Sequence, residues 1–207
     1  MQDEEGRWRD KEADIEEVFV DYFSNIFKSS NPSNMEDIFN AMDRKVSNEM
    51  NAFLDKDFSE EKLHKALFQM CPNKASGPDG MSACFYQKHW SIVGKDICKV
   101  VGRFLNGEGQ LSKINQTNVV LIPKNKTPAS ARDYRPISLC NVVYKIIAKA
   151  LVNRLKTILP RIIDESQSAF VPGRVIFDNI IVAHEVIHNM NTKKKGKTGY
   201  VAVKLDE

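Results

Sequence analysis

The sequence predicts an α+β fold that is mostly helical and contains one β-hairpin. Apolar residues recur at helical spacing over residues 15–30, 59–70, 90–105, 141–160 and 175–190. Two short β-prone runs, residues 118–124 and 134–139, flank a polar loop, which is the pattern of a hairpin. A third β-prone run, residues 200–205, leads directly to the carboxylate of Asp206. With 207 residues, 42% of them hydrophobic, the chain is long enough to bury a core.

Local signals set the expected helix ends. Ser59 precedes two glutamates, so it is the expected N-cap of the helix over 59–70. The turn-rich run CPNKASGPDG, residues 71–80, ends that helix, and GEGQ ends the next. The helix over 141–160 has an apolar stripe expected to face the core, formed by Val143, Ile146, Ile147, Ala150, Leu151, Leu155, Ile158 and Leu159. The buried stripe expected for the helix over 175–190 is Ile176, Ile180, Ala183, Ile187 and Met190.

Composition argues against secreted and membrane proteins. The first residues are acidic, unlike a signal peptide, and no apolar run reaches membrane-spanning length. We therefore expect no membrane partner and a nuclear or cytoplasmic location. The four cysteines lie far apart without a CxxC pair, so we interpret them as reduced thiols that fill the core, namely Cys71, Cys84, Cys98 and Cys140.

Charge is distributed unevenly along the chain. Residues 1–111 carry 14 basic and 20 acidic residues, whereas residues 112–207 carry 16 basic and 7 acidic ones. The net charges are therefore −6 and +9. A basic half is typical of a surface that meets a polyanion, and a solvated face is the alternative explanation. Lys145 and Lys149, opposite the apolar stripe of the helix over 141–160, are candidates for nucleic-acid binding.

The expected hairpin carries a candidate phosphate site. Lys124 closes its first strand and Arg135 lies at the start of its second, with no acid between Lys124 and Asp133. Arginine grips phosphate oxygens in a fork and lysine adds a point charge, so the pair would suit a triphosphate. Either residue alone is more often an ordinary surface charge.

Two turns are further candidates for nucleic-acid contacts. In NKASGPDGM, Lys74 lies beside a tight Gly-Pro-Asp-Gly turn and would meet a phosphate, although a plain turn is the simpler explanation. In SQSAFVPGR, the polar residues Gln167 and Arg174 bracket the aromatic Phe170. Such a loop can support a nucleic-acid strand, and a helix-capping turn is the alternative.

Taken in order, NKASGPDGM, VVLIPK, DYRPISLCNVVYKIIAKALVNRLKTILPRII, ESQSAFVPGR and the terminal VKLD resemble the fingers and early palm of reverse transcriptases from LINE-type (non-LTR) retrotransposons, especially plant ones. The resemblance covers residues 58–206. It implies fingers and early palm over residues 58–198 and a first palm strand, truncated, over 199–207. Residues 1–57 resemble the helical linker that precedes this domain in such proteins. The implied fold is an incomplete α+β polymerase.

The resemblance also implies an activity, RNA-directed DNA synthesis from dNTPs on an RNA template with a DNA primer. Arg135 and Lys124 match the family's triphosphate contacts. Asp206 matches the first of the palm carboxylates, the catalytic residues that bind two Mg²⁺ ions. Family members supply the other acids after this point, whereas this sequence has Glu207 and then ends. We therefore expect the chain alone to be inactive.

Two alternatives remain open. The first is a nucleic-acid-binding remnant without catalysis, which needs only the basic half. The second is a zinc metalloprotease, because residues 184–188, HEVIH, would place His184 and His188 on one zinc with Glu185 as general base. The metzincin extension of this motif is absent, since Asn191 and Lys194 stand where glycine and histidine are needed.

Overall fold

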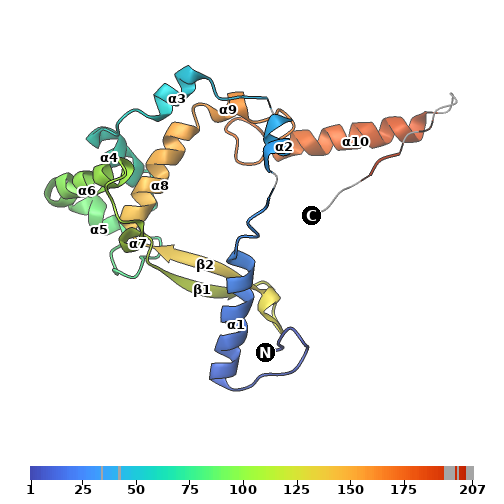
Figure 1. Ribbon diagram of the computed structural model, residues 1–207, viewed down its shortest axis with the longest axis horizontal. Helices are drawn as coiled ribbons and strands as arrows, with labels where there is room; N and C mark the ends of the chain where they lie inside the picture. Colours follow the sequence, from blue (N-terminus) through green and yellow to red (C-terminus); the bar gives the residue numbers. More distant parts are fainter. Residues whose placement is uncertain (34, 42, 194–198, 200, 204–207) are drawn as a thin grey trace. The chain divides into compact units, whose positions relative to one another are not determined.

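A computed structural model describes residues 1–33, 35–41, 43–193, 199 and 201–203 (Figure 1). The chain divides into two compact units. Unit 1 contains residues 1–43 and 57–151, and unit 2 contains residues 44–56 and 152–207.

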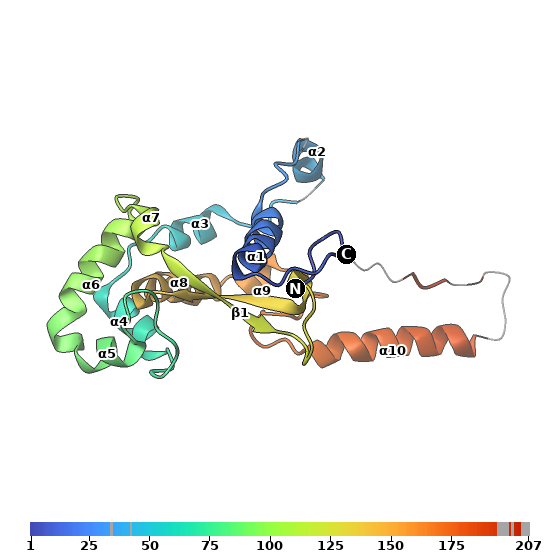
Figure 2. The same ribbon diagram turned by 90° about the horizontal axis from the view of Figure 1, so that it is seen from below.

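Unit 1 is formed by helices and one antiparallel hairpin. Its elements are α1 (Glu12–Phe27), α2 (Met35–Asn40), α4 (Glu60–Phe68), α5 (Ala83–Lys88), α6 (Trp90–Leu105), α7 (Leu111–Ile114), β1 (Thr117–Pro123), the 3₁₀ turn η1 (Ala131–Asp133), β2 (Tyr134–Cys140) and most of α8 (Val142–Leu155). Helices α4, α5 and α6 lie side by side (Figure 2). The largest fully buried side chains, at most 1% exposed, come from α4, α6 and α8: Leu63, Leu67, Val101, Val142 and Ile146.

The predicted hairpin is confirmed. Strands β1 and β2 pair in antiparallel register, with Ile122 opposite Arg135 and Pro123 opposite Tyr134. Helices together with this two-stranded sheet confirm the α+β class. The connection between the strands, residues 124–133, ends in η1.

Unit 2 contains α3 (Asn48–Leu54), the last residues of α8, α9 (Leu159–Ile162) and α10 (Ile176–Thr192). The Arg154 guanidinium donates to the Leu54 carbonyl oxygen at 2.5 Å, which ties α8 to the end of α3. Ile158 and Val171 are buried here.

The single helix predicted over 141–160 is wrong, because α8 ends at Leu155 and α9 begins at Leu159. Pro160 has no N–H, and its ring would clash with the carbonyl of Lys156 in a continuous helix. The break changes the expected stripe. Ile146, Ile147, Ala150 and Ile158 are buried, whereas Leu151 and Leu155 are exposed.

Two further expectations about burial are wrong. The apolar stripe predicted to be buried on α10 is not, since no residue of this helix is buried. Periodicity identifies an apolar face, but burial needs another element to cover it, and none does so among the described residues. The cysteines are free thiols, but none is fully buried: Cys71 is exposed, Cys84 and Cys140 are half-buried, and only half-buried Cys98 packs against the core cluster among the described residues.

The third predicted strand is not formed where it is described. Residues 199 and 201–203 have no strand conformation, and Val201 and Val203 are exposed. A strand requires a partner for its backbone groups, and the described residues offer none. The remainder of this segment, including Asp206, lies outside the described residues. Ser59 occupies the expected N-cap position of α4, but its hydroxyl accepts no capping hydrogen bond.

Candidate functional site

The two cations of the hairpin lie at its connected end. Arg135 is opposite Ile122 and shares its face of the hairpin, and Lys124 is the first residue after β1. The Lys124 N–H donates to the Asp133 carbonyl oxygen at 2.6 Å, and its ammonium donates to the Arg132 carbonyl oxygen at 2.5 Å. The Arg135 side chain is exposed, and its guanidinium makes no hydrogen bond or ion pair with any residue the structure describes. The hairpin therefore presents an unpaired guanidinium beside an anchored lysine.

The connection between the strands is organised by the Asp133 carboxylate. This group accepts hydrogen bonds from the N–H groups of Ala129 and Ser130, both at 2.9 Å, and from the Asn125 amide at 3.1 Å. The bond from the Ser130 N–H, followed by that from Ala129, holds the pKa of Asp133 below its usual value. Sequence reasoning gave Asp133 no role, although the pair Ser130 and Asp133 has the spacing of a capping box.

We expect acid to loosen this connection. A folded-state pKa below the unfolded value of 3.8 means that ionised Asp133 stabilises the fold above that pH, and that the stabilisation is lost as the pH falls through the lowered pKa. Amide exchange at Ala129 and Ser130, corrected for its intrinsic pH dependence, should rise as the pH falls below 3.8 and through the lowered pKa of Asp133. In the Asp133→Asn variant these two amides should exchange faster at neutral pH than in the unsubstituted chain. Equal protection of both amides in this variant would contradict the assignment.

The Gly-Pro-Asp-Gly turn is attached to the base of the hairpin. The Asp79 N–H donates to the side-chain oxygen of Asn141 at 3.2 Å, and the Lys145 ammonium donates to the Ala75 carbonyl oxygen at 2.9 Å. Gly77 is buried, and a Cβ there would lie 2.6 Å from the carbonyl carbon of Cys140. The turn therefore lies directly against the end of β2 and the start of α8. Sequence reasoning missed Asn141.

This contact gathers the predicted basic residues of unit 1. Lys145 reaches the residue that follows Lys74, and Lys149 lies one helical turn further along α8. Lys74 is exposed, and Lys145 and Lys149 are half-buried. The role predicted for these three lysines in nucleic-acid binding stays a prediction.

In unit 2, Arg174 holds the loop that carries the other candidates. Its guanidinium donates to the carbonyl oxygens of Gln167 at 2.7 Å, Ile163 at 3.1 Å and Pro160 at 3.4 Å, and also to that of Asp164. Its donors therefore serve the loop backbone. Gln167 is exposed, and so is Phe170, at 98%. Phe170 has φ +64°, a left-handed conformation that is uncommon outside glycine.

Replacing Arg174 should release this loop. Lysine has one compact ammonium and cannot reach all these carbonyls, so Arg174→Lys should fail to rescue Arg174→Ala. We expect each variant to destabilise the loop by about 1–3 kcal/mol, measured by hydrogen exchange at the Gln167 amide. Arg161→Ala, an exposed arginine on α9, is the matched control and should change protection little. Unchanged protection of the Gln167 amide in Arg174→Lys would show that the several donors of the guanidinium are not required to hold the loop.

The described residues give no geometry for a metal site. Asp206 lies outside them, and within them no three potential ligands gather. His184 and His188 lie parallel on α10 with ring centroids 6.5 Å apart, but no third ligand accompanies them in the described part of the chain. The metalloprotease alternative therefore lacks its third ligand there.

No helix in the described ranges is long and apolar enough to cross a membrane.

Comparisons with known proteins agree with these motifs. Residues 122–206 match the reverse transcriptase (RNA-dependent DNA polymerase) family. Over 170 residues the chain is 33% identical to a Xenopus laevis protein described as the transposon TX1 uncharacterized 149 kDa protein. The match covers 81% of this chain and 13% of the Xenopus protein. Together, the two matches identify the chain as a reverse transcriptase sequence of the non-LTR, LINE-type retrotransposon class.

Proposed function

We propose that this chain contributes substrate-binding parts of an RNA-directed DNA polymerase. The hairpin of β1 and β2 holds the triphosphate of the incoming dNTP. Lys74, Lys145 and Lys149, near the base of the hairpin, support the RNA template and the DNA primer. One observation carries the proposal: Arg135 is exposed and unpaired among the described residues, on a hairpin whose connection is fixed by Asp133.

The chemistry of the two cations fits this role. The Arg135 guanidinium has all its donors available and can grip two phosphate oxygens at once. The Lys124 ammonium uses one donor on the Arg132 carbonyl oxygen and keeps two for phosphate. Both side chains therefore keep donors free for the triphosphate.

Catalysis in the parent polymerase depends on Mg²⁺, and we propose that Asp206 is one ligand of a two-ion site. The ions would lower the pKa of the primer hydroxyl and neutralise the leaving pyrophosphate. A carboxylate is the kind of ligand Mg²⁺ prefers, but one carboxylate cannot hold both ions. We therefore propose that a polypeptide limited to residues 1–207 does not extend primers by itself. We also propose that it acts in the nucleus or cytoplasm.

A nucleic-acid-binding role without catalysis is the second candidate, favoured by the net charge of +9 over residues 112–207. The two candidates differ in one measurement. Binding of single-stranded RNA that weakens steeply with salt, combined with no dNTP binding, would favour the second.

Substitution of Arg135 tests the proposed function. Affinity of the 207-residue chain for a fluorescent dNTP, measured by anisotropy, should fall about tenfold or more in Arg135→Ala, because the fork to the phosphates is lost. Arg103→Ala removes an exposed arginine near the end of α6 and should leave affinity unchanged. Equal affinity in Arg135→Ala and the unsubstituted chain would refute the proposal.

A further inference from the structure

Residues 1–9 fold back on themselves. The Asp3 N–H donates to the Arg7 carbonyl oxygen at 3.0 Å, and Gln2 and Trp8 form an antiparallel bridge. The Asp3 carboxylate accepts bonds from the Arg7 N–H at 2.8 Å, the Arg7 Nε at 3.0 Å and the Arg9 Nε at 2.9 Å. Burial acts to raise the pKa of Asp3, but these bonds together hold it at about 2. The segment is therefore a preformed turn at neutral pH.

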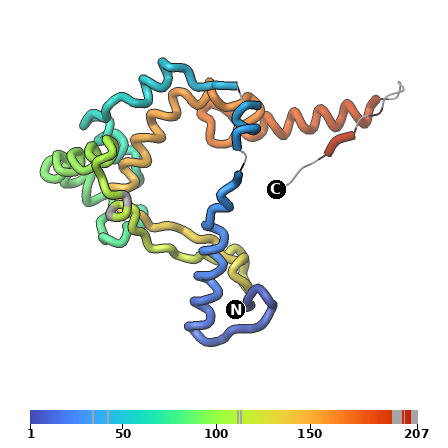
Figure 3. Tube along the Cα trace, viewed as in Figure 1, coloured from blue at the N-terminus to red at the C-terminus, as the bar shows by residue number. Residues whose placement is uncertain are grey.

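This turn pairs with the connection of the hairpin. The Gln2 N–H donates to the Ala129 carbonyl oxygen at 2.7 Å, and Gln2 forms a parallel bridge with Ser130. The Asp133 carboxylate takes the N–H groups of the same two residues, Ala129 and Ser130. Their backbone is thus held from one side by Asp133 and from the other by Gln2. Figure 3 shows the N-terminal segment beside this connection.

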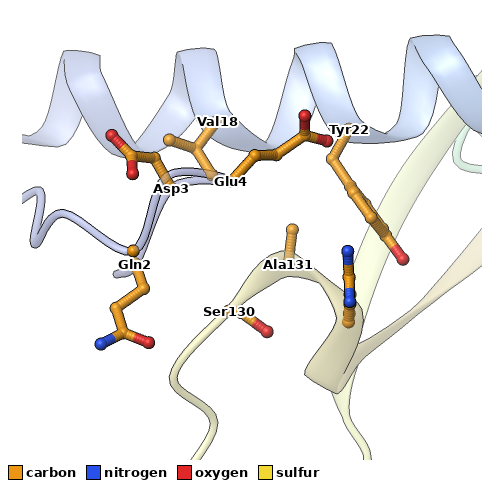
Figure 4. A pocket seen from close by; sticks show the side chains of 9 residues that line it. Gln2, Asp3, Glu4, Val18, Tyr22, Ser130 and Ala131 are labelled. Atoms are coloured by element: carbon orange, nitrogen blue, oxygen red, sulfur yellow. The ribbon is translucent and has the colours of Figure 1, made fainter.

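Helix α1 completes the contact. The edge of the Phe19 ring meets Tyr134 at right angles, with centroids 5.0 Å apart, and Tyr134 immediately precedes Arg135. Val18 and Tyr22 of α1 face Ser130 and Ala131 across a cavity of about 250 Å³ (Figure 4). Ala131 is only 4% exposed. Because side chains alternate along a strand, Tyr134 and Arg135 point to opposite faces of β2, so Phe19 meets the face that does not carry Arg135.

We propose that residues 1–27 form a brace that positions the connection between β1 and β2, and with it Lys124 and Arg135, for the triphosphate. The proposal rests on the function proposed above. The path is short, because the Lys124 ammonium is anchored to Arg132 inside the braced connection and Arg135 follows the braced Tyr134. Because coupling between two sites is reciprocal, nucleotide binding must in turn stabilise the brace.

A matched pair of substitutions tests the brace in the 207-residue chain. Gln2→Pro removes the N–H that binds Ala129, whereas Gln2→Ala keeps it. Gln2→Pro should speed amide exchange at Ala129 and Ser130 and weaken dNTP binding about threefold to tenfold. Gln2→Ala should match the unsubstituted chain in both measurements. Adding dNTP should slow exchange at the Asp3 amide of the unsubstituted chain and not of Gln2→Pro, a coupling that a merely structural contact would not produce.

A second variant addresses the other half of the contact. Phe19→Ala should weaken dNTP binding as Gln2→Pro does, while Phe27→Ala, a 68% exposed ring on the same helix, should not. The brace is overturned if Gln2→Pro and Phe19→Ala both keep full dNTP affinity while Arg135→Ala loses it. If Arg135→Ala itself keeps full affinity, the proposed function fails instead, whatever the exchange rates at Ala129 and Ser130.

Discussion

Replacing Gly77 with alanine should destabilise unit 1 by about 2–3 kcal/mol, although it adds a single methyl group. The new Cβ would overlap backbone atoms of Cys140 and Asn141, which cannot move aside as a flexible side chain can. The turn would have to leave the start of α8. It would then lose the bond from Asp79 to Asn141 and the bond from Lys145 to Ala75.

The measurement is denaturant unfolding followed by the fluorescence of Trp90, in a Trp8→Phe background that leaves one tryptophan. Gly102→Ala is the matched control. It lies within α6, and its new Cβ meets nothing within 4 Å, so alanine should stabilise the helix by about 0.5–1 kcal/mol. Equal stability of Gly77→Ala and the parent would show that the turn does not lie against α8.

Truncating Ile146 to alanine should cost about 2–5 kcal/mol. Ile146 is fully buried in the cluster that contains Leu67 of α4 and Val101 of α6. Its removal leaves a cavity between three helices, and the loss combines the missing burial with the empty volume. The same fluorescence measurement reports it.

Leu151→Ala provides the control on the same helix. The sequence places Leu151 in the buried stripe, but the structure leaves it 45% exposed. We therefore expect a loss of at most about 1 kcal/mol, small beside that of Ile146→Ala. A loss at Leu151 as large as the loss at Ile146 would favour the stripe predicted from the sequence.

The elements that sequence reasoning identified correctly have strong local signals. Helix α6 begins and ends as predicted, β1 begins and ends one residue earlier than predicted, and β2 ends one residue later. Helices α2, α3, α5 and α7 were not predicted, because four to seven residues are too few to show a helical period. Burial on α10 could not be predicted, since it depends on what covers the helix rather than on its own pattern.

In the candidate site, too, residues with local signals were predicted and residues that act through distant contacts were not. Arg135 and Lys124 are recognisable because their spacing and their hairpin are local features. Asp133, Asn141 and Gln2 act through contacts with backbone groups elsewhere in the fold, and such contacts leave little trace in composition or periodicity. The sequence did not reveal that Arg174 donates to the carbonyls of its own loop, and its contact with nucleic acid stays a prediction, as do those of Gln167 and Phe170.

Photocrosslinking tests the central claim most directly. A dNTP analogue with a photoreactive group on its γ-phosphate would be bound to the 207-residue chain and irradiated, and the labelled peptides identified by mass spectrometry. The account predicts label within residues 118–139, removed by excess unmodified dNTP and greatly reduced in Arg135→Ala. The claim that β1 and β2 hold the triphosphate would be contradicted by label on α10 or on the loop of Arg174 that excess dNTP removes, with no label on the hairpin.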